Sequence, residues 1–236
     1  MKKITTLFLL LVSITLFSQE ITGDELLEKA INYHDPNDNW STFSGEFFVL
    51  METPKRSPRK SRIRINLPEQ YFFLKAARDT IITEYAVHKT DCSFAINGNT
   101  NPSEVLKKQY SLNCERAKFM KNYYTYLYGL PMKLKDAGTI INQKVAKKTF
   151  KGKEYLVLKA TYNKEVGKDT WYFYFDPKTY AMEVYQFFKD ESKNDGEYIL
   201  LSGLETINTI KMPKNRAWYY NKDNGYLGTD ILSAKQ

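Results

Sequence analysis

The chain has 236 residues, a length that suits one domain with a full core, because single β-rich domains reach roughly 200–250 residues. The 35 Lys and Arg residues outnumber the 27 Asp and Glu residues, and the formal net charge is +8. The positive charge is spread along the chain, apart from a denser run at 55–62. Such a run is typical of a solvated loop, with contact to an anionic partner as the alternative.

The first residues have the pattern of a signal peptide. Lys2 and Lys3 precede an apolar run over 4–17, and Ser18 opens a polar stretch. The run is too short to span a bilayer comfortably, and no later stretch is apolar enough to do so. We predict a signal peptide over 1–18, with a buried N-terminal helix as the alternative. The mature chain, 19–236, is then periplasmic or secreted, and export argues against nucleic acid as a partner.

A helix followed by several strands is predicted for the N-terminal half. Thr22 and Glu25 have the spacing of a capping box, and Pro36 ends the helix. Alternation of apolar and polar residues, bounded by turn residues, then indicates strands. These strands are expected over 40–53, 61–67, 71–75, 80–88 and 92–96.

The period then changes to that of helices over about 101–129. Asn101 is a good N-cap, and a second helical segment over 114–128 is stopped by Gly129 and Pro131. The two cysteines, Cys92 and Cys114, flank the change from strands to helices. In an oxidising compartment they permit a disulfide that pins the helical insert to the sheet, with two free thiols as the alternative.

From Thr139 onward the pattern predicts strand after strand, which indicates an antiparallel sheet or barrel. No linker or repeat interrupts the chain, so we expect one α+β domain of mainly antiparallel strands. The expected strands are 140–150, 154–162, 170–175, 181–188, 198–202, 207–212 and 217–220, the last two separated by Pro213.

No constellation of residues marks an enzyme, a cofactor site or a metal site. The two histidines, His34 and His88, have no nucleophile motif nearby, and a structural role is expected for each. The paired short spacings of a zinc site do not occur. The acidic hairpin over 190–197 lacks the ligand periodicity of an EF-hand, so a solvated turn is expected there, with a weak calcium site as the alternative.

The strand over 169–175 is the most informative segment for function. Its alternation puts three large apolar rings on one face and tyrosines on the other. The same parity argument in the earlier strands predicts a single apolar wall, which forms either a core packed under a helix or a partly open ligand cavity. The seven wall residues are Phe47, Val49, Ile63, Ile65, Trp171, Phe173 and Phe175.

The order of elements resembles the carrier fold of the LolA/LolB lipoprotein-sorting proteins. The matching stretches are the helix at 25–30, the strand at 43–47, the basic strand with its proline turn at 62–72, and the strand and turn at 94–99. The resemblance implies a curved sheet or incomplete barrel covered by the N-terminal helix and the central insert. The segments 33–36 and 126–131 also look like those of an uncharacterised family of exported proteins from Gram-negative bacteria. The cysteine-bearing insert and the many tyrosines depart from a dedicated lipoprotein chaperone.

Two functions therefore compete. The first is a non-catalytic periplasmic binding or carrier protein for a lipid, an acyl chain or another apolar ligand, with lipoprotein-related cargo as one member of the class. The second is a structural or interaction module of the cell envelope, with a filled core and an envelope protein as partner. A hydrolase would need a convergent polar site, which the sequence does not reveal.

Overall fold

The computed structural model describes residues 20–235, so the predicted signal peptide lies outside the described residues. The first helix, α1 (Gly23–His34), begins where the sequence indicates. The Glu25 N–H donates to Thr22 Oγ1, and the Thr22 N–H donates to the Glu25 carboxylate at 2.8 Å. This capping box satisfies backbone groups that have no partner within the helix.

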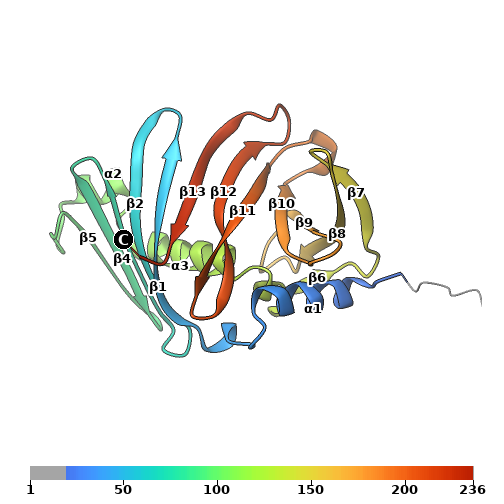
Figure 1. The fold of residues 1–236 in the computed structure, drawn as a ribbon. Helices are drawn as coiled ribbons and strands as arrows, with labels where there is room; N and C mark the ends of the chain where they lie inside the picture. Colours follow the sequence, from blue (N-terminus) through green and yellow to red (C-terminus); the bar gives the residue numbers. More distant parts are fainter. Residues whose placement is uncertain (1–19, 236) are drawn as a thin grey trace, which may run out of the picture.

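A single large antiparallel sheet forms the body of the molecule (Figure 1). Its strands lie in the order β5-β4-β3-β2-β1-β13-β12-β11-β10-β9-β8-β6, and β7 also pairs with β8. The N-terminal strands are β1 (Ser44–Thr53), β2 (Arg56–Asn66), β3 (Tyr71–Arg78), β4 (Ile81–His88) and β5 (Asp91–Ile96). The later strands are β6 (Thr139–Ile141), β7 (Ala146–Phe150), β8 (Lys153–Tyr162), β9 (Thr170–Phe175), β10 (Met182–Phe188), β11 (Glu197–Ile207), β12 (Ile210–Tyr220) and β13 (Tyr226–Ser233).

The sheet curves but does not close into a barrel, and the predicted α+β fold class is confirmed. The first and last strands meet in its middle, where Val49 of β1 pairs with Leu232 of β13. The outer strands of the order are β5 and β6. The curvature leaves a concave face that helices cover (Figure 1).

The helical insert supplies that cover. It contains α2 (Glu104–Tyr110) and α3 (Cys114–Gly129), and α3 packs against β3, β4 and β5. Asn113 caps α3, because its side chain accepts a hydrogen bond from the Arg116 N–H. The predicted disulfide is present between Cys92 of β5 and Cys114, the first residue of α3. The bridge therefore fixes the start of the covering helix to an outer strand.

Two hydrophobic clusters lie on opposite faces of the sheet. The larger one fills the concave face under α1 and α3, and the smaller one surrounds Tyr155, Val157, Tyr174 and Val184. The tyrosines of β9 lie on the face opposite its apolar rings, as the alternation predicts. Tyr174 is nevertheless buried on that face, because β7 and its Phe150 pack over it.

Several sequence-based assignments need correction, beginning with the strand predicted over 40–53, whose first residues form a short 3-10 helix, Trp40–Thr42, before β1. The basic run at 55–62 is not a loop, because β2 begins at Arg56, and Pro58 is accommodated where the register with β1 shifts. The strand predicted over 140–150 is two strands, β6 and β7. Pro213 does not divide β12, since it lies beyond the stretch that pairs with β13. Finally, β13 itself was not predicted.

Candidate ligand-binding site

The structure places the seven predicted wall residues in one filled core rather than around a cavity. All seven belong to the large concave cluster, and six of them are at most 2% exposed. Phe47 packs on Tyr128 of α3 with ring centroids 4.8 Å apart. Trp171 is partly buried and stacks on Phe187 and Phe173. Because α3 covers these rings, the middle of the concave face is packed like a protein interior.

A cavity opens farther along the same strands, at one end of the sheet. It has a volume of about 810 Å³, and none of the seven wall residues lines it. Its walls come from the β1–β2, β3–β4 and β12–β13 hairpins, whose turns lie at the same end of the sheet (Figure 1), and from the end of α2. The lining residues are Met51, Thr53, Pro54, Lys55, Arg56, Arg59, Ala76, Arg78, Asp79, Ile81, Thr83, Tyr110, Tyr220, Tyr226 and Leu227.

The cavity is a continuation of the concave face, because alternate residues of a strand share one face. In β1 the buried Phe47 and Val49 are followed by Met51 at the same parity, and Met51 pairs with Arg59 of β2. In β3 the same parity leads from buried core residues to Arg78. Tyr110 is held at the cavity because its carbonyl accepts a hydrogen bond from the Tyr85 hydroxyl at 3.0 Å.

The lining of the large cavity has a net positive charge. Lys55, Arg56, Arg59 and Arg78 line the cavity, and the one acidic residue among the lining residues is Asp79. Within residues 20–235, none of these four cations forms an ion pair. Burial lowers the pKa of the Arg78 guanidinium, and the positive charges of Arg59 and Arg56 lower it further.

A smaller pocket of about 270 Å³ adjoins this cavity and shares residues of β1 and β13 with it. Asp230 lines it, is 4% exposed, and accepts a hydrogen bond from Trp218 Nε1 at 3.2 Å. Its other carboxylate oxygen has no hydrogen-bond partner in the described structure. Burial raises the pKa of this carboxyl, while the nearby Arg59 and Arg216 lower it.

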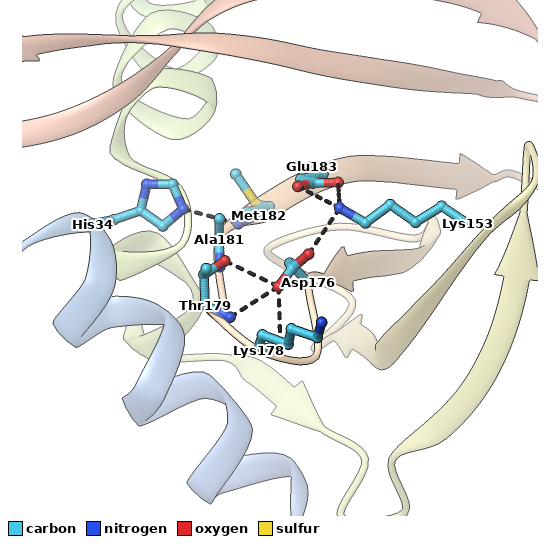
Figure 2. Close-up of polar contacts among 8 residues, drawn as sticks. All are labelled: His34, Lys153, Asp176, Lys178, Thr179, Ala181, Met182 and Glu183. Atoms are coloured by element: carbon cyan, nitrogen blue, oxygen red, sulfur yellow. Dashed lines mark hydrogen bonds and ion pairs between the residues drawn. The ribbon is translucent and has the colours of Figure 1, made fainter.

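The two histidines lie in different environments. His34 is fully buried, and its Nε2 accepts a hydrogen bond from the Met182 N–H at 3.0 Å (Figure 2). Nδ1 must then carry the proton, and it donates to the Lys211 carbonyl at 2.7 Å. Burial lowers the pKa of His34 to about 4, so the ring is neutral near pH 7. His88 is exposed at the end of β4.

The hairpin beside His34 ties three charged side chains together (Figure 2). Lys153 pairs with Asp176 at 2.8 Å and with Glu183 at 2.7 Å. The Asp176 carboxylate also accepts hydrogen bonds from the Lys178 and Thr179 N–H groups. The hydrogen bond from Lys153 and those from the turn hold the pKa of Asp176 well below its ordinary value. This network closes the β9–β10 turn and gives Lys153, Asp176 and Glu183 partners within it.

In the acidic hairpin at 190–197, Asp190 and Asp195 are used within the turn, and Glu191 pairs with Lys159 of β8 at 3.0 Å. Asp195 accepts hydrogen bonds from the Lys189 and Asp190 N–H groups, and Asp190 pairs with Lys193. Among residues 20–235, no group of three or more His, Cys, Asp or Glu side chains is arranged to hold a metal ion. None of the helices in the described part of the chain has the length and apolar character needed to span a bilayer.

Sequence reasoning missed the residues that line the cavity, although one signal was present. The alternation that identifies Ile63 and Ile65 as inward-facing extends back through Ser61 to Arg59. This alternation places Arg59 on the same face as the apolar wall. We did not extend the strand to Arg59, because we assigned 55–62 to a solvated loop. That Arg78 and Leu227 line the same cavity could be seen only once the strand order was known.

Comparison with known proteins agrees with the resemblances expected from the sequence. A DUF1329 family protein from Desulfovibrio piger is 9% identical, with 89% of this chain and 91% of that chain covered and a TM-score of 0.53. A LolA superfamily protein from Nitrosomonas europaea is 10% identical, with 90% and 92% covered and a TM-score of 0.49. A lipoprotein-sorting protein domain from Vibrio parahaemolyticus is 11% identical, with 89% and 91% covered and a TM-score of 0.49.

At such low identity these similarities concern the fold, and the Desulfovibrio structure is the one that supports it. A search of curated proteins finds no match. A profile described as a family of unknown function, DUF6503, matches residues 2–234. The chain therefore belongs to the DUF6503 family.

Proposed function

We propose that this protein is a non-catalytic binding or carrier protein for an apolar ligand, such as a lipid or an acyl chain, and that it acts in the periplasm or outside the cell. The observation that carries the proposal is the cavity of about 810 Å³ at the end of the half-barrel. Ligand pockets in proteins have volumes of roughly 300–1,000 Å³. The cavity lies in this range, and lipoprotein-related cargo belongs to the same class of ligand.

The lining suits an apolar group. Met51, Ile81 and Leu227 contribute aliphatic surface, and Tyr110 and Tyr226 contribute rings. Methionine adapts to irregular ligands because its side chain is unbranched and polarizable. Leu227 lines both the large cavity and the smaller pocket beside Trp218. An acyl chain that enters the large cavity can therefore extend along Leu227 toward the Trp218 indole.

The packed centre of the concave face supports the second candidate, an interaction module of the cell envelope. Phe173 and Phe175 are 0% exposed under the helices, so no ligand reaches the predicted wall without movement of α3. In that function the cavity would hold no ligand, and the surface would serve a protein partner. The two candidate functions differ in whether the large cavity binds a small apolar molecule.

Binding of a neutral apolar dye, Nile red, to the purified mature protein tests the proposal. We expect saturable binding with energy transfer from tryptophan, because Trp218 lines the adjoining pocket. Leu227→Asp should abolish binding, because it replaces aliphatic lining surface with a charged and strongly hydrated carboxylate. Leu204→Asp is the matched control, because Leu204 is 46% exposed on β11 and lines neither pocket. Absence of dye binding by the wild-type protein would remove the carrier and leave the interaction module.

A further inference from the structure

Two of the four positive charges at the cavity, those of Arg59 and Arg78, lie on its inner wall, whereas Lys55 and Arg56 are exposed at its rim. Arg59 has the parity of Ile63 and Ile65, and Arg78 has the parity of Phe72 and Leu74, all of which face the concave core. The neighbouring pair Lys60–Ala77 places the ends of β2 and β3 side by side. Both guanidinium groups therefore point into the hollow of the sheet.

The two arginines converge on Met51. Met51 of β1 pairs directly with Arg59 across the strands. Arg78 Nη2 lies 4.0 Å from Met51 Sδ, so the Arg78 side chain reaches across β2 to the same place. Arg56, opposite Thr53, adds a third guanidinium one step nearer the solvent. Three guanidinium groups and one thioether thus form a cationic patch with an apolar floor.

Two hydrogen-bond donors in this patch have no partner within residues 20–235. The Nε groups of Arg59 and Arg78 are buried and have no partner among the described residues. Arg59 Nη2 donates to the Tyr124 hydroxyl at 3.2 Å, which fixes the guanidinium without neutralising it. Asp79, the one acid of the lining, is exposed at the β3–β4 turn. Buried donors that lack partners are uncommon in proteins, and a bound anion would satisfy them.

The charge changes sign across Met51. Asp230 of β13 pairs with Met51 on the side opposite to Arg59. An anion is therefore favoured on the arginine side and repelled from the Trp218 side. An apolar chain attached to that anion can follow Leu227 and Met51 toward Trp218 in the smaller pocket, whose charged lining residues are Asp230 and Glu197. The site thus has a cationic end and an end with apolar surface, as an amphiphile requires.

From this arrangement we propose that Arg56, Arg59 and Arg78 bind the phosphate group of an anionic lipid whose acyl chain occupies the apolar part of the cavity. Planar guanidinium groups match phosphate oxygens through paired hydrogen bonds, which is why arginine is preferred for this group. The inference rests on the proposed function, because it assigns a headgroup to the ligand class already proposed.

Three probes separate the parts of this ligand. They are lysophosphatidic acid, the monoacylglycerol with the same chain, and glycerol 3-phosphate, each titrated into the mature protein below micelle-forming concentrations. We expect lysophosphatidic acid to bind about tenfold or more tightly than monoacylglycerol, because charge-assisted hydrogen bonds are the strong ones. Raised salt should reduce this preference, since exposed charges are screened. Glycerol 3-phosphate should bind far more weakly, because it lacks the chain.

The Arg59→Gln/Arg78→Gln variant should lose the preference for lysophosphatidic acid and keep its affinity for monoacylglycerol. The matched control is Lys60→Gln/Lys147→Gln, which removes the same charge at exposed positions that do not line the cavity. The melting temperature of each variant shows whether it folds. Arg56→Gln serves as the second variant, because that side chain is exposed and its loss does not disturb the core.

The outcomes are distinct. If neither lipid binds, the proposed function fails. If both lipids bind equally, or if the arginine variants retain the preference, the headgroup inference fails while the carrier function stands. Glycerol 3-phosphate binding as tightly as lysophosphatidic acid would show a site for free phosphate and overturn the lipid headgroup. A preference that the arginine variants lose and the lysine control keeps supports the inference.

Discussion

His34 shows at the scale of one residue why a histidine in an uncharacterised chain need not be catalytic. Its two ring nitrogens join α1 to β10 and to Lys211 of β12 through main-chain groups. The next residue, Asp35, is also buried, and its carboxylate accepts the Asn39 and Trp40 N–H groups. The segment at 33–36 is therefore explained by the docking of α1. The sequence predicted a structural role for His34 but not its hydrogen-bond partners, because Met182 and Lys211 lie about 150–180 residues away along the chain.

The neutral state of His34 predicts a loss of stability in acid. Its pKa is about 4 in the folded chain against an ordinary value of 6.5. Between these two pH values the unfolded chain binds a proton that the folded chain excludes. The stabilisation is therefore complete above pH 6.5 and is lost as the pH falls to 4. At about 1.4 kcal/mol per pH unit this amounts to about 3 kcal/mol.

Urea unfolding of the wild type and of His34→Gln between pH 7 and pH 4.5 measures this effect. The wild type should lose more stability than the variant over that range, because glutamine does not titrate. Carboxyl groups titrate in both proteins, so the difference between the two curves isolates the histidine. The exposed His88→Gln is the control and should follow the wild type. Parallel curves for wild type and His34→Gln would contradict the assignment.

At the scale of elements, the hairpins with strong local signals were predictable. Turn residues at Lys151-Gly152 and at 176–179 joined strands that the structure contains. Gly152 has φ +83°, a conformation that favours glycine. Alternation then gave the inward faces of β1, β2 and β9 correctly, because one register step would move the buried set to the other face.

The last strand could not be predicted in the same way. β13 carries the buried Asp230 at an inward-facing position, and Gly228 lies two residues before it at the same parity. A charged residue and a glycine at inward positions break the apolar alternation by which strands are recognised. Asp230 has polar partners at this position, because it accepts a hydrogen bond from Trp218 and lies opposite Arg216 of β12. The missed strand is thus the one that helps to build the candidate site.

The disulfide fixes one element to another, and its removal should lower stability. Cys92 and Cys114 are separated by 22 residues, and closing a loop of that size stabilises a protein by roughly 3 kcal/mol in the chain-entropy model. Cys92→Ala/Cys114→Ala should therefore unfold at lower urea concentration than the wild type. Reduced wild-type protein should behave like the variant. Equal midpoints for the oxidised wild type and the variant would count against a stabilising bridge.

At the scale of the whole molecule, the location of the site depended on strand order. The cavity joins residues of β1 and β3 to residues of β13, and the first strand meets the last one across more than 170 positions. No local pattern encodes such a pairing. The sequence predicted one apolar wall along the sheet, whereas the structure divides it lengthwise into a filled centre and a hollow end. Helix α3 causes the division, because it covers the centre and not the hairpin tips.

This division predicts that stability and binding can be separated by mutation. Phe173 is 0% exposed in the filled centre, so Phe173→Ala should destabilise the fold by about 3–5 kcal/mol through the cavity it leaves. The folded fraction should still bind Nile red with wild-type affinity, because Phe173 does not line the mouth. Leu227→Asp should give the opposite result, with binding lost and a smaller change in stability. Urea unfolding and dye titration of both variants, at temperatures where each is folded, make the comparison. Loss of dye binding in folded Phe173→Ala would show that the ligand reaches the centre of the concave face, and the mouth would then be only its entrance.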